Sequence, residues 1–193
     1  MDQAREKSQL RKTLRQARRE HVEAQPDAFR ALLFNHPPRP VLSVIREDAK
    51  IGLYHSTEFE APMASYARHF AESGHTIALP RFEAENAPMA FAEHTDPFAE
   101  NDLEPGPFGI VQPSANASEV VPDVVFVPLV GFTERFERLG QGGGHYDRWL
   151  GEHPTTFAIG LAWDVQLVEA LPIEPHDVRM DAIITPTRLF GEF

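Results

Sequence analysis

The chain has 193 residues, of which 42% are hydrophobic and 24% charged, enough to bury the core of one globular domain. It has no cysteine, which excludes disulfides, thiolate metal sites and a cysteine nucleophile. A formal net charge of −11 disfavours nucleic acid and anionic membranes as partners, and no apolar run approaches the roughly 20 residues that span a bilayer.

The N-terminal segment predicts a basic helix. Residues 3–24 contain neither Pro nor Gly and are rich in strong helix formers. Lys7 and Arg11 are four residues apart, so one face of the helix presents both. Taken alone, such a helix is typical of a solvated surface, and Arg18 and Arg19 are assigned to that surface.

The next part of the chain predicts short helices alternating with short strands. Helices are expected over residues 27–35, 41–46 and 60–73, ended by a proline cluster in the first case and by Gly74 in the last. Strands are expected over residues 51–55, 75–79 and 89–92. The polar residues 93–122, rich in Pro, Asp and Glu, predict a long surface excursion.

The most β-branched segment, Val120–Val130, predicts a central strand that is buried on both faces. After it come a glycine-rich loop, a helix from Gly144 to Gly151, and strands over residues 157–163 and 180–185. This alternation predicts a single α/β domain, residues 1–193, with one open, mostly parallel sheet sandwiched by helices. Ligands of such sheets bind at the carboxyl ends of the strands, where the glycine-rich loop lies.

The glycine-rich loop, Arg138 to Asp147, is the best candidate for a phosphate site. Its four glycines let backbone N–H groups approach a ligand, and a helix start adds a favourable dipole. Arg138 and Arg148 could clamp phosphate, and Asp147 suits Mg²⁺. A P-loop is excluded because no Gly-Lys-Ser/Thr follows, and the dinucleotide fingerprint fails at His145. Glycines alone are equally typical of a flexible turn.

The run Val127–Phe132 followed by Arg138-Leu-Gly-x-Gly-Gly-Gly-x-Tyr-Asp-Arg148 resembles the signature of the 5-formyltetrahydrofolate cyclo-ligases, or methenyltetrahydrofolate synthetases. Further segments resemble the family in the same order along nearly the whole chain. They are Lys7-x-x-Leu-Arg11-x-x-x-Arg15, Leu53–Glu60, Leu79-Pro-Arg81, Phe108-Gly-Ile-x-x-Pro113, Ile159–Val168 and His176-Asp177-x-x-x-Asp181-x-Ile-Ile-Thr185.

The resemblance implies a carbon–nitrogen ring-forming ligase with the family's open α/β sandwich. Such an enzyme uses ATP and Mg²⁺ to convert 5-formyltetrahydrofolate to 5,10-methenyltetrahydrofolate through a phosphorylated formyl intermediate, releasing ADP and phosphate. The residues that it implies as ATP-binding are Lys7, Arg11, Arg138, Leu139, Gly140, Gln141, Gly142, Gly143, Gly144, His145 and Tyr146, with Lys7, Arg11 and Arg138 catalytic. Those implied for folate are Leu53, Glu58 and Gln141, Gly142, Gly143, Gly144 and His145, and those for magnesium are Asp147 and Asp177.

Two positions depart from the family pattern. The family has Phe-Asp-x-x-Gly where this chain has Phe132–Phe136, and an aromatic residue where it has His145. These departures leave open an ATP-using paralogue with altered folate specificity. Glu58 could instead cap the following helix, and Asp181 could ligate the metal or only start a strand.

Other classes of function stay open as well. The basic N-terminal helix is compatible with a non-catalytic anion-binding module, and a similar sheet occurs in phosphosugar isomerases. The charged N-terminus lacks the apolar core of a signal peptide. We expect a cytoplasmic monomer that binds neither nucleic acid nor membranes.

Overall fold

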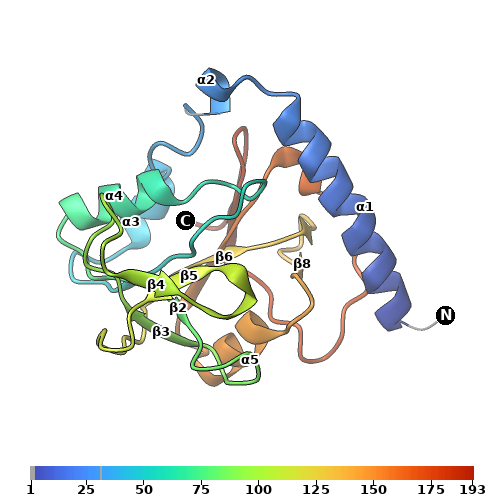
Figure 1. Cartoon of the computed structure of the whole chain (residues 1–193). Helices are drawn as coiled ribbons and strands as arrows, with labels where there is room; N and C mark the ends of the chain where they lie inside the picture. The colour runs from blue at the N-terminus through green and yellow to red at the C-terminus, as the bar shows by residue number, and fades with distance from the viewer. Residues whose placement is uncertain (1–2, 31) are drawn as a thin grey trace.

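A seven-stranded sheet lies at the centre of the protein in a computed structural model that describes residues 3–30 and 32–193 (Figure 1). The strand order is β11-β10-β9-β6-β1-β2-β3. The strands are β1 Ile51–Gly52, β2 Ile77–Arg81, β3 Ala90–Glu93, β6 Val124–Pro128, β9 Phe157–Leu161, β10 Ala182–Ile184 and β11 Leu189–Gly191. The five inner strands are parallel and the two edge strands antiparallel, which confirms the predicted fold class.

The central strand β6 has apolar neighbours on both faces. Val124 and Phe126 pack in the core cluster on one side of the sheet, and Val125 and Val127 pack in the cluster on the other. A strand buried in this way requires a continuous apolar run instead of an alternating one. The prediction of a central strand within Val120–Val130 is therefore confirmed.

Helices cover both faces of this sheet. They are α1 Gln3–Glu23, α2 Asp27–Arg30, α3 Arg39–Val44, α4 Ala64–Glu72 and α5 His145–Glu152. Phe70 of α4 and Val41 of α3 pack in one core cluster, and Trp149 and Leu150 of α5 pack in the other. Figure 1 shows α1 running along one edge of the molecule. No helix of the described residues has the length and apolarity to cross a membrane.

Two small hairpins lie outside the main sheet. Strands β7 Gly131–Phe132 and β8 Arg138–Leu139 pair just before the glycine-rich loop. Strands β4 Leu103–Pro105 and β5 Val111–Pro113 pair within the region predicted as a surface excursion, joined by a 3-10 turn, η1 Pro107–Gly109.

The second hairpin is held against the main sheet by polar contacts. The polar composition of residues 93–122 had predicted a surface excursion and gave no sign of these contacts. The buried Gln112 side chain accepts from the backbone N–H of Phe82 at 3.0 Å and donates to its carbonyl at 3.1 Å. Arg81 contacts Glu104 at 2.8 Å. The hairpin therefore stands at the end of β2, beside the site described below.

Several predicted elements are shorter than expected. The helix predicted over residues 27–35 is a single turn ending at Arg30, and Phe34 has a φ of 56°, which an α-helix does not accommodate. The helix predicted from Glu60 begins at Ala64, because Pro62 disfavours helical backbone at the residue before it. Strand β1 ends at Gly52, although the N–H of Leu53 still donates to the Ala78 carbonyl at 2.8 Å.

Gly52 allows a close approach at the centre of the sheet, and its replacement by Ala is expected to be destabilising. A Cβ there would lie 2.9 Å from Pro122 and 3.0 Å from both Phe91 and Val125. We expect the free energy of unfolding to fall by about 1–3 kcal/mol, measured by urea denaturation. Gly151→Ala is the control, because Gly151 lies in α5 and a Cβ added there would meet no atom within 4 Å. It should be neutral or stabilising by up to about 1 kcal/mol, and equal losses in the two variants would contradict the packing argument.

Candidate functional site

A pocket of about 890 Å³ lies at the carboxyl ends of the parallel strands. Pro80 of β2 and Pro128 of β6 line its floor, α1 forms one wall and the glycine-rich loop another. The predicted site residues on its lining are Lys7, Arg11, Asp177 and the whole loop from Arg138 to Asp147. The structure therefore brings together residues that are up to 170 positions apart in the chain.

Helix α1 turns charged side chains toward the protein. Lys7, Leu14 and Arg18 are all buried, at the spacing of a core-facing helix stripe. The prediction that Arg18 belongs to the surface is wrong, because only 6% of it is exposed and it lines the pocket. The same assignment for Arg19 is confirmed, since its side chain is 57% exposed.

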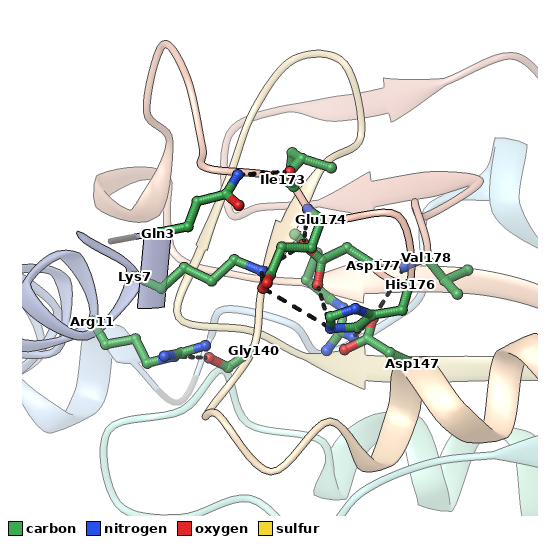
Figure 2. A network of polar contacts seen from close by, with 11 residues as sticks. Gln3, Lys7, Arg11, Gly140, Asp147, Ile173, Glu174, His176, Asp177 and Val178 are labelled. Carbon is green, nitrogen blue, oxygen red and sulfur yellow. Dashed lines mark hydrogen bonds and ion pairs between the residues drawn. The ribbon is translucent and has the colours of Figure 1, made fainter. Parts of the chain in front are cut away.

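Other basic side chains of α1 bind the glycine-rich loop directly. Arg11 Nε donates to the carbonyl of Gly140 at 2.8 Å, as Figure 2 shows. Arg15 Nη2 donates to the backbone and side-chain oxygens of Gln141 at 2.9 and 2.7 Å. These contacts fix the loop against the helix and leave the cationic face of α1 along the pocket.

Lys7 lies between two carboxylates. Its Nζ is 2.6 Å from Glu174 Oε2 and 2.6 Å from Asp177 Oδ2 (Figure 2). Burial favours neutral Lys7, but the hydrogen bonds to Asp177 and Glu174 outweigh it and raise the Lys7 pKa. Burial likewise disfavours ionised Asp177, yet the bond from Lys7 and the N–H of Glu174 lower the Asp177 pKa. Lys7 and Asp177 are therefore both charged at neutral pH, and Glu174 is a site residue that the sequence motifs did not indicate.

The glycine-rich loop ends at an uncapped helix start. Gly142 has a φ of 112° and Gly144 a φ of 65°, a region that other residues rarely adopt. Gly144 is the N-cap of α5, and no side-chain capping hydrogen bond is made there within the described residues. Free N–H groups and the helix dipole favour an anion at this position.

Asp147 follows the loop and is fixed by one of its two oxygens. Its Oδ1 accepts from Arg138 Nη2 at 2.6 Å and from the N–H of Val178 at 3.1 Å. The contact with residue 178 places Asp147 near the segment Glu174–Val178, and Asp147 and Asp177 both line the pocket. Ligand atoms of Glu174, His176 and Asp177 lie within 4.8 Å of one another. This donor set is mostly carboxylate oxygen, which fits Mg²⁺.

His145 stands where the family has an aromatic residue, and its own ring packs among aromatic side chains. Its ring centroid lies 4.8 Å from that of Phe82 and 5.5 Å from that of Phe108. Its Nδ1 is 3.1 Å from Arg148 Nη2. Because a guanidinium only donates, Nδ1 must accept, and the proton of the neutral ring is on Nε2. Burial and then the charge of Arg148 lower the His145 pKa, consistent with this neutral form.

Leu53 and Glu58, two of the residues predicted to contact folate, are not among the residues that line this pocket. Leu53 is fully buried in the core, and the exposed Glu58 borders a smaller pocket that shares Thr57 and Glu60 with the first. The alternative role of Glu58 as a helix cap is wrong, because α4 has Met63 at its N-cap and no side-chain cap. Asp181, just before β10, accepts from the N–H of Ala158 at 2.7 Å. This contact supports the alternative that Asp181 only starts the strand and does not ligate a metal.

Glu60 lies where Glu58 was expected. It lines the pocket, accepts from Gln141 Nε2 at 3.2 Å and accepts from the N–H of Thr57 at 2.9 Å. The tight turn in which the N–H of Glu60 donates to the carbonyl of Thr57 directs the second glutamate of Glu58-Phe-Glu60 inward. The sequence offered both glutamates and no local signal to choose between them.

The turn Thr133–Phe136 before the loop is built from residues that differ from the family pattern. Buried Thr133 stands at the family's aspartate and accepts from the N–H of Arg135 at 3.3 Å. Phe136 stands at the family's glycine and has a φ of 65°, the left-handed backbone that glycine favours. The backbone at Phe136 is therefore of the kind that the family's glycine would adopt readily.

Comparison with known proteins points to one family. A sequence model described as the 5-formyltetrahydrofolate cyclo-ligase family matches residues 3–186. Over 87 residues the chain is 42% identical to the 5-formyltetrahydrofolate cyclo-ligase of Escherichia coli (strain K12). This match covers 42% of the chain and 48% of the relative, so it spans about half the length of that protein.

Two solved structures are similar over nearly their whole length. The 5,10-methenyltetrahydrofolate synthetase of Aquifex aeolicus superposes with a TM-score of 0.75 at 25% identity, covering 96% of this chain and 92% of that one. The 5,10-methenyltetrahydrofolate synthetase of Mycoplasma pneumoniae has a TM-score of 0.66 at 22% identity, covering 92% and 97%. The second likeness bears on the fold alone.

The Lys7 ion pairs should stabilise the fold in a pH-dependent way. Lys7→Met leaves Glu174 and Asp177 without a counter-ion, and we expect a loss of about 1–3 kcal/mol at pH 7. The loss is below that of a fully buried pair because the Glu174 side chain is 34% exposed. The lowered pKa of Asp177 stabilises the fold above the unfolded carboxyl pKa of about 3.9, and this contribution is lost as the pH falls through the folded value.

The difference between wild type and Lys7→Met should therefore narrow below about pH 4. Urea denaturation across this pH range measures it. Lys12→Met, on the exposed side of the same helix, should change stability by less than about 0.5 kcal/mol. A loss in Lys7→Met that does not vary with pH would show that the ion pairs are not its cause.

Proposed function

The chain belongs to the 5-formyltetrahydrofolate cyclo-ligase family, and from this premise we propose that it uses ATP to cyclise 5-formyltetrahydrofolate to 5,10-methenyltetrahydrofolate. The observation that carries the proposal is the division of one pocket into two unlike halves. One half, called the cationic half, contains Lys7, Arg11, Arg138 and the glycine-rich loop and suits phosphates. The carboxylates Asp147, Glu174 and Asp177 lie beside these cations and suit a metal ion. Leu79, Phe82, Met89, Phe108 and Ile110 form an apolar half, beside Glu60, suited to a flat heterocycle.

The reaction requires activation of a formamide, whose oxygen is a poor leaving group. The formyl oxygen attacks the γ-phosphorus of ATP, and the bond from that phosphorus to the β,γ-bridging oxygen breaks to release ADP. The N10 amine then attacks the formyl carbon of the phosphorylated iminium and loses its proton. Cleavage of the C–O bond expels phosphate and completes the methenyl ring. Positioning and charge stabilisation are the protein's main tasks in such a transfer.

The cationic half supplies the charge that this transfer needs. Arg138, with only 3% of its side chain exposed, is fixed by Asp147 at 2.6 Å, so its guanidinium is already positioned beside the loop. Lys7 is held by Glu174 and Asp177. We assign Lys7, Arg11 and Arg138 to stabilising the charge of the transferred phosphoryl group, and the loop from Leu139 to Tyr146 to binding the other phosphates.

Asp147 and Asp177 would hold magnesium, with Glu174 as a further carboxylate nearby. A magnesium ion bound there would neutralise charge on the ATP phosphates. The hydrogen bonds of Asp147 to other described residues all use Oδ1, which leaves Oδ2 for such a ligand.

In the folate half, we propose Glu60 in place of Glu58 as the carboxylate that accepts from the substrate's N–H donors. The backbone N–H of Thr57 and the side chain of Gln141 orient it. Gln141 also contacts Arg15 of α1, so it joins the two halves of the pocket. The segment Gln141–His145 then separates the folate from the phosphates. Tyr54, and not the core residue Leu53, faces the pocket after β1.

Purified protein given 5-formyltetrahydrofolate, ATP and Mg²⁺ should produce the near-ultraviolet absorbance of the methenyl product, with equimolar ADP and phosphate. Omitting ATP should abolish the signal. Binding of ATP without any gain in absorbance would reject the cyclo-ligase activity in favour of a paralogue with other substrate specificity.

Asp147→Asn should lower kcat/KM at least about a hundredfold, because it removes a charge that both orients Arg138 and would hold magnesium. The matched control is Asp181→Asn, whose side chain accepts a backbone hydrogen bond away from the pocket lining. It should retain most of the activity. A non-catalytic anion-binding module predicts instead that Asp147→Asn binds ATP as the wild type does and that neither protein turns it over.

A further inference from the structure

Arg18 is a buried guanidinium with little to neutralise it. Only 6% of the residue is exposed, and its single hydrogen bond to the described residues runs from Nη1 to the Leu129 carbonyl at 3.5 Å. That carbonyl already accepts from Gln166 Nε2 at 2.7 Å. Arg18 Nε has no hydrogen-bond partner in the described part of the chain. Burying an ion in this way is costly unless a partner is supplied.

The other cations on the same face of α1 are better satisfied. Lys7 has two carboxylates at 2.6 Å, and Arg11 has the Gly140 carbonyl at 2.8 Å. Within residues 3–30 and 32–193, Arg18 makes no ion pair within 4.0 Å. Yet it lines the pocket, so a bound molecule can supply the acceptor that the protein does not.

Arg18 lies further along α1 than Lys7 and Arg11, the two helix residues assigned to the phosphates. It is eleven residues beyond Lys7 on a continuous helix, or roughly 16 Å along the axis. Tyr54 and Glu60 line the same pocket. Burial lowers the Arg18 pKa, and the charge of Glu60 is the largest of the effects that oppose this lowering. The acceptor that Arg18 lacks therefore belongs to the second substrate and not to ATP.

A second unsatisfied group lies near the same carboxylate. The Tyr146 hydroxyl is buried and has no hydrogen-bond partner among the described residues. Burial raises the Tyr146 pKa, and Glu60 adds to this effect, so the hydroxyl is neutral. A donor-only guanidinium and an acceptor-only carboxylate thus line one part of the pocket, and the Tyr146 hydroxyl adds a neutral group between them and Arg138, whose guanidinium carbon lies 5.9 Å from the centroid of the Tyr146 ring. Together they match a heterocycle that presents a carbonyl oxygen next to N–H donors.

We propose that Arg18 is a specificity-determining residue that donates to the 4-oxo oxygen of the pterin ring, while Glu60 accepts from the neighbouring N3–H and 2-amino groups. This inference rests on the proposed function, because it assigns one edge of the folate to one end of the pocket. It predicts that the protein selects 2-amino-4-oxopteridines over 2,4-diaminopteridines. The latter place a donor opposite the donor-only Arg18.

The test compares Arg18→Met with Arg19→Met, since Arg19 is the next residue on α1 and its side chain is 57% exposed. In Arg18→Met we expect the KM for 5-formyltetrahydrofolate to rise about ten- to hundredfold, the loss of one charged hydrogen bond. The KM for ATP and the melting temperature should stay near wild type, because Met fills the volume without a buried charge. Arg19→Met should leave both KM values unchanged.

A binding measurement separates recognition from folding. The wild type should bind a 2-amino-4-oxopteridine at least about tenfold more tightly than the matching 2,4-diaminopteridine. Arg18→Met should lose that preference, and Arg18→Lys should retain part of it because it still presents a donor. If Arg18→Met does not fold, the wild type and Arg18→Lys still decide the question.

Two results would overturn the inference. One is equal binding of the two pteridines by the wild type. The other is an Arg18→Met protein with a lowered melting temperature and both KM values raised alike, which would make Arg18 a structural anchor of α1. Neither result affects the formation of methenyl product by the wild type, so the proposed activity and this assignment fail separately.

Discussion

The site depends on the docking of a helix whose inward face is charged. The side chains of Lys7, Arg11 and Arg18 lie where a core-facing helix normally carries apolar residues. Burying such groups is costly without a partner, and the partners of Lys7 and Arg11 lie 167 and 129 positions further along the chain. The docked position of helix α1 therefore depends on the segments around Gly140 and Glu174. The same contacts that hold α1 also enclose the phosphate end of the pocket.

The features that the sequence predicted well are those set by residues close together in the chain. The run around β6 and the glycines before α5 constrain their own backbone, so the central strand and the loop could be located without tertiary information. The burial of Arg18 could not, because a charged helix face has the same local pattern whether it meets water or a pocket. The choice of Glu60 over Glu58 likewise depends on how the turn at Thr57 is oriented by its neighbours. The hairpin of β4 and β5 was missed because a polar glutamine, Gln112, takes the place of an apolar contact with the sheet.

The turn at Thr133–Phe136 is built without the side chains of the family's motif. A threonine hydroxyl can accept from a backbone N–H two residues on, as an aspartate does, though more weakly. The positive φ at Phe136 costs a non-glycine residue about 1 kcal/mol or more. Its ring packs against the core cluster that contains Phe132, which offsets part of that cost. The strand pair that leads into the loop thus forms without the family's aspartate and glycine.

The two ends of the folate half carry different polar groups, and this difference restricts how a pterin can be oriented in the pocket. Arg18 and Glu60 offer charged groups at one end, whereas His145 at the boundary with the phosphates is a neutral ring, with Nδ1 engaged by Arg148 and a single N–H on Nε2. In a pterin, N5 lies next to the carbonyl edge, so a 4-oxo oxygen bound at Arg18 places the N5 formyl group on the same side of the ring. The transferable phosphate must then reach the formyl group along that side, past the segment Gln141–His145. The charges of Arg18 and Glu60 would therefore fix the side of the pterin from which the phosphate approaches.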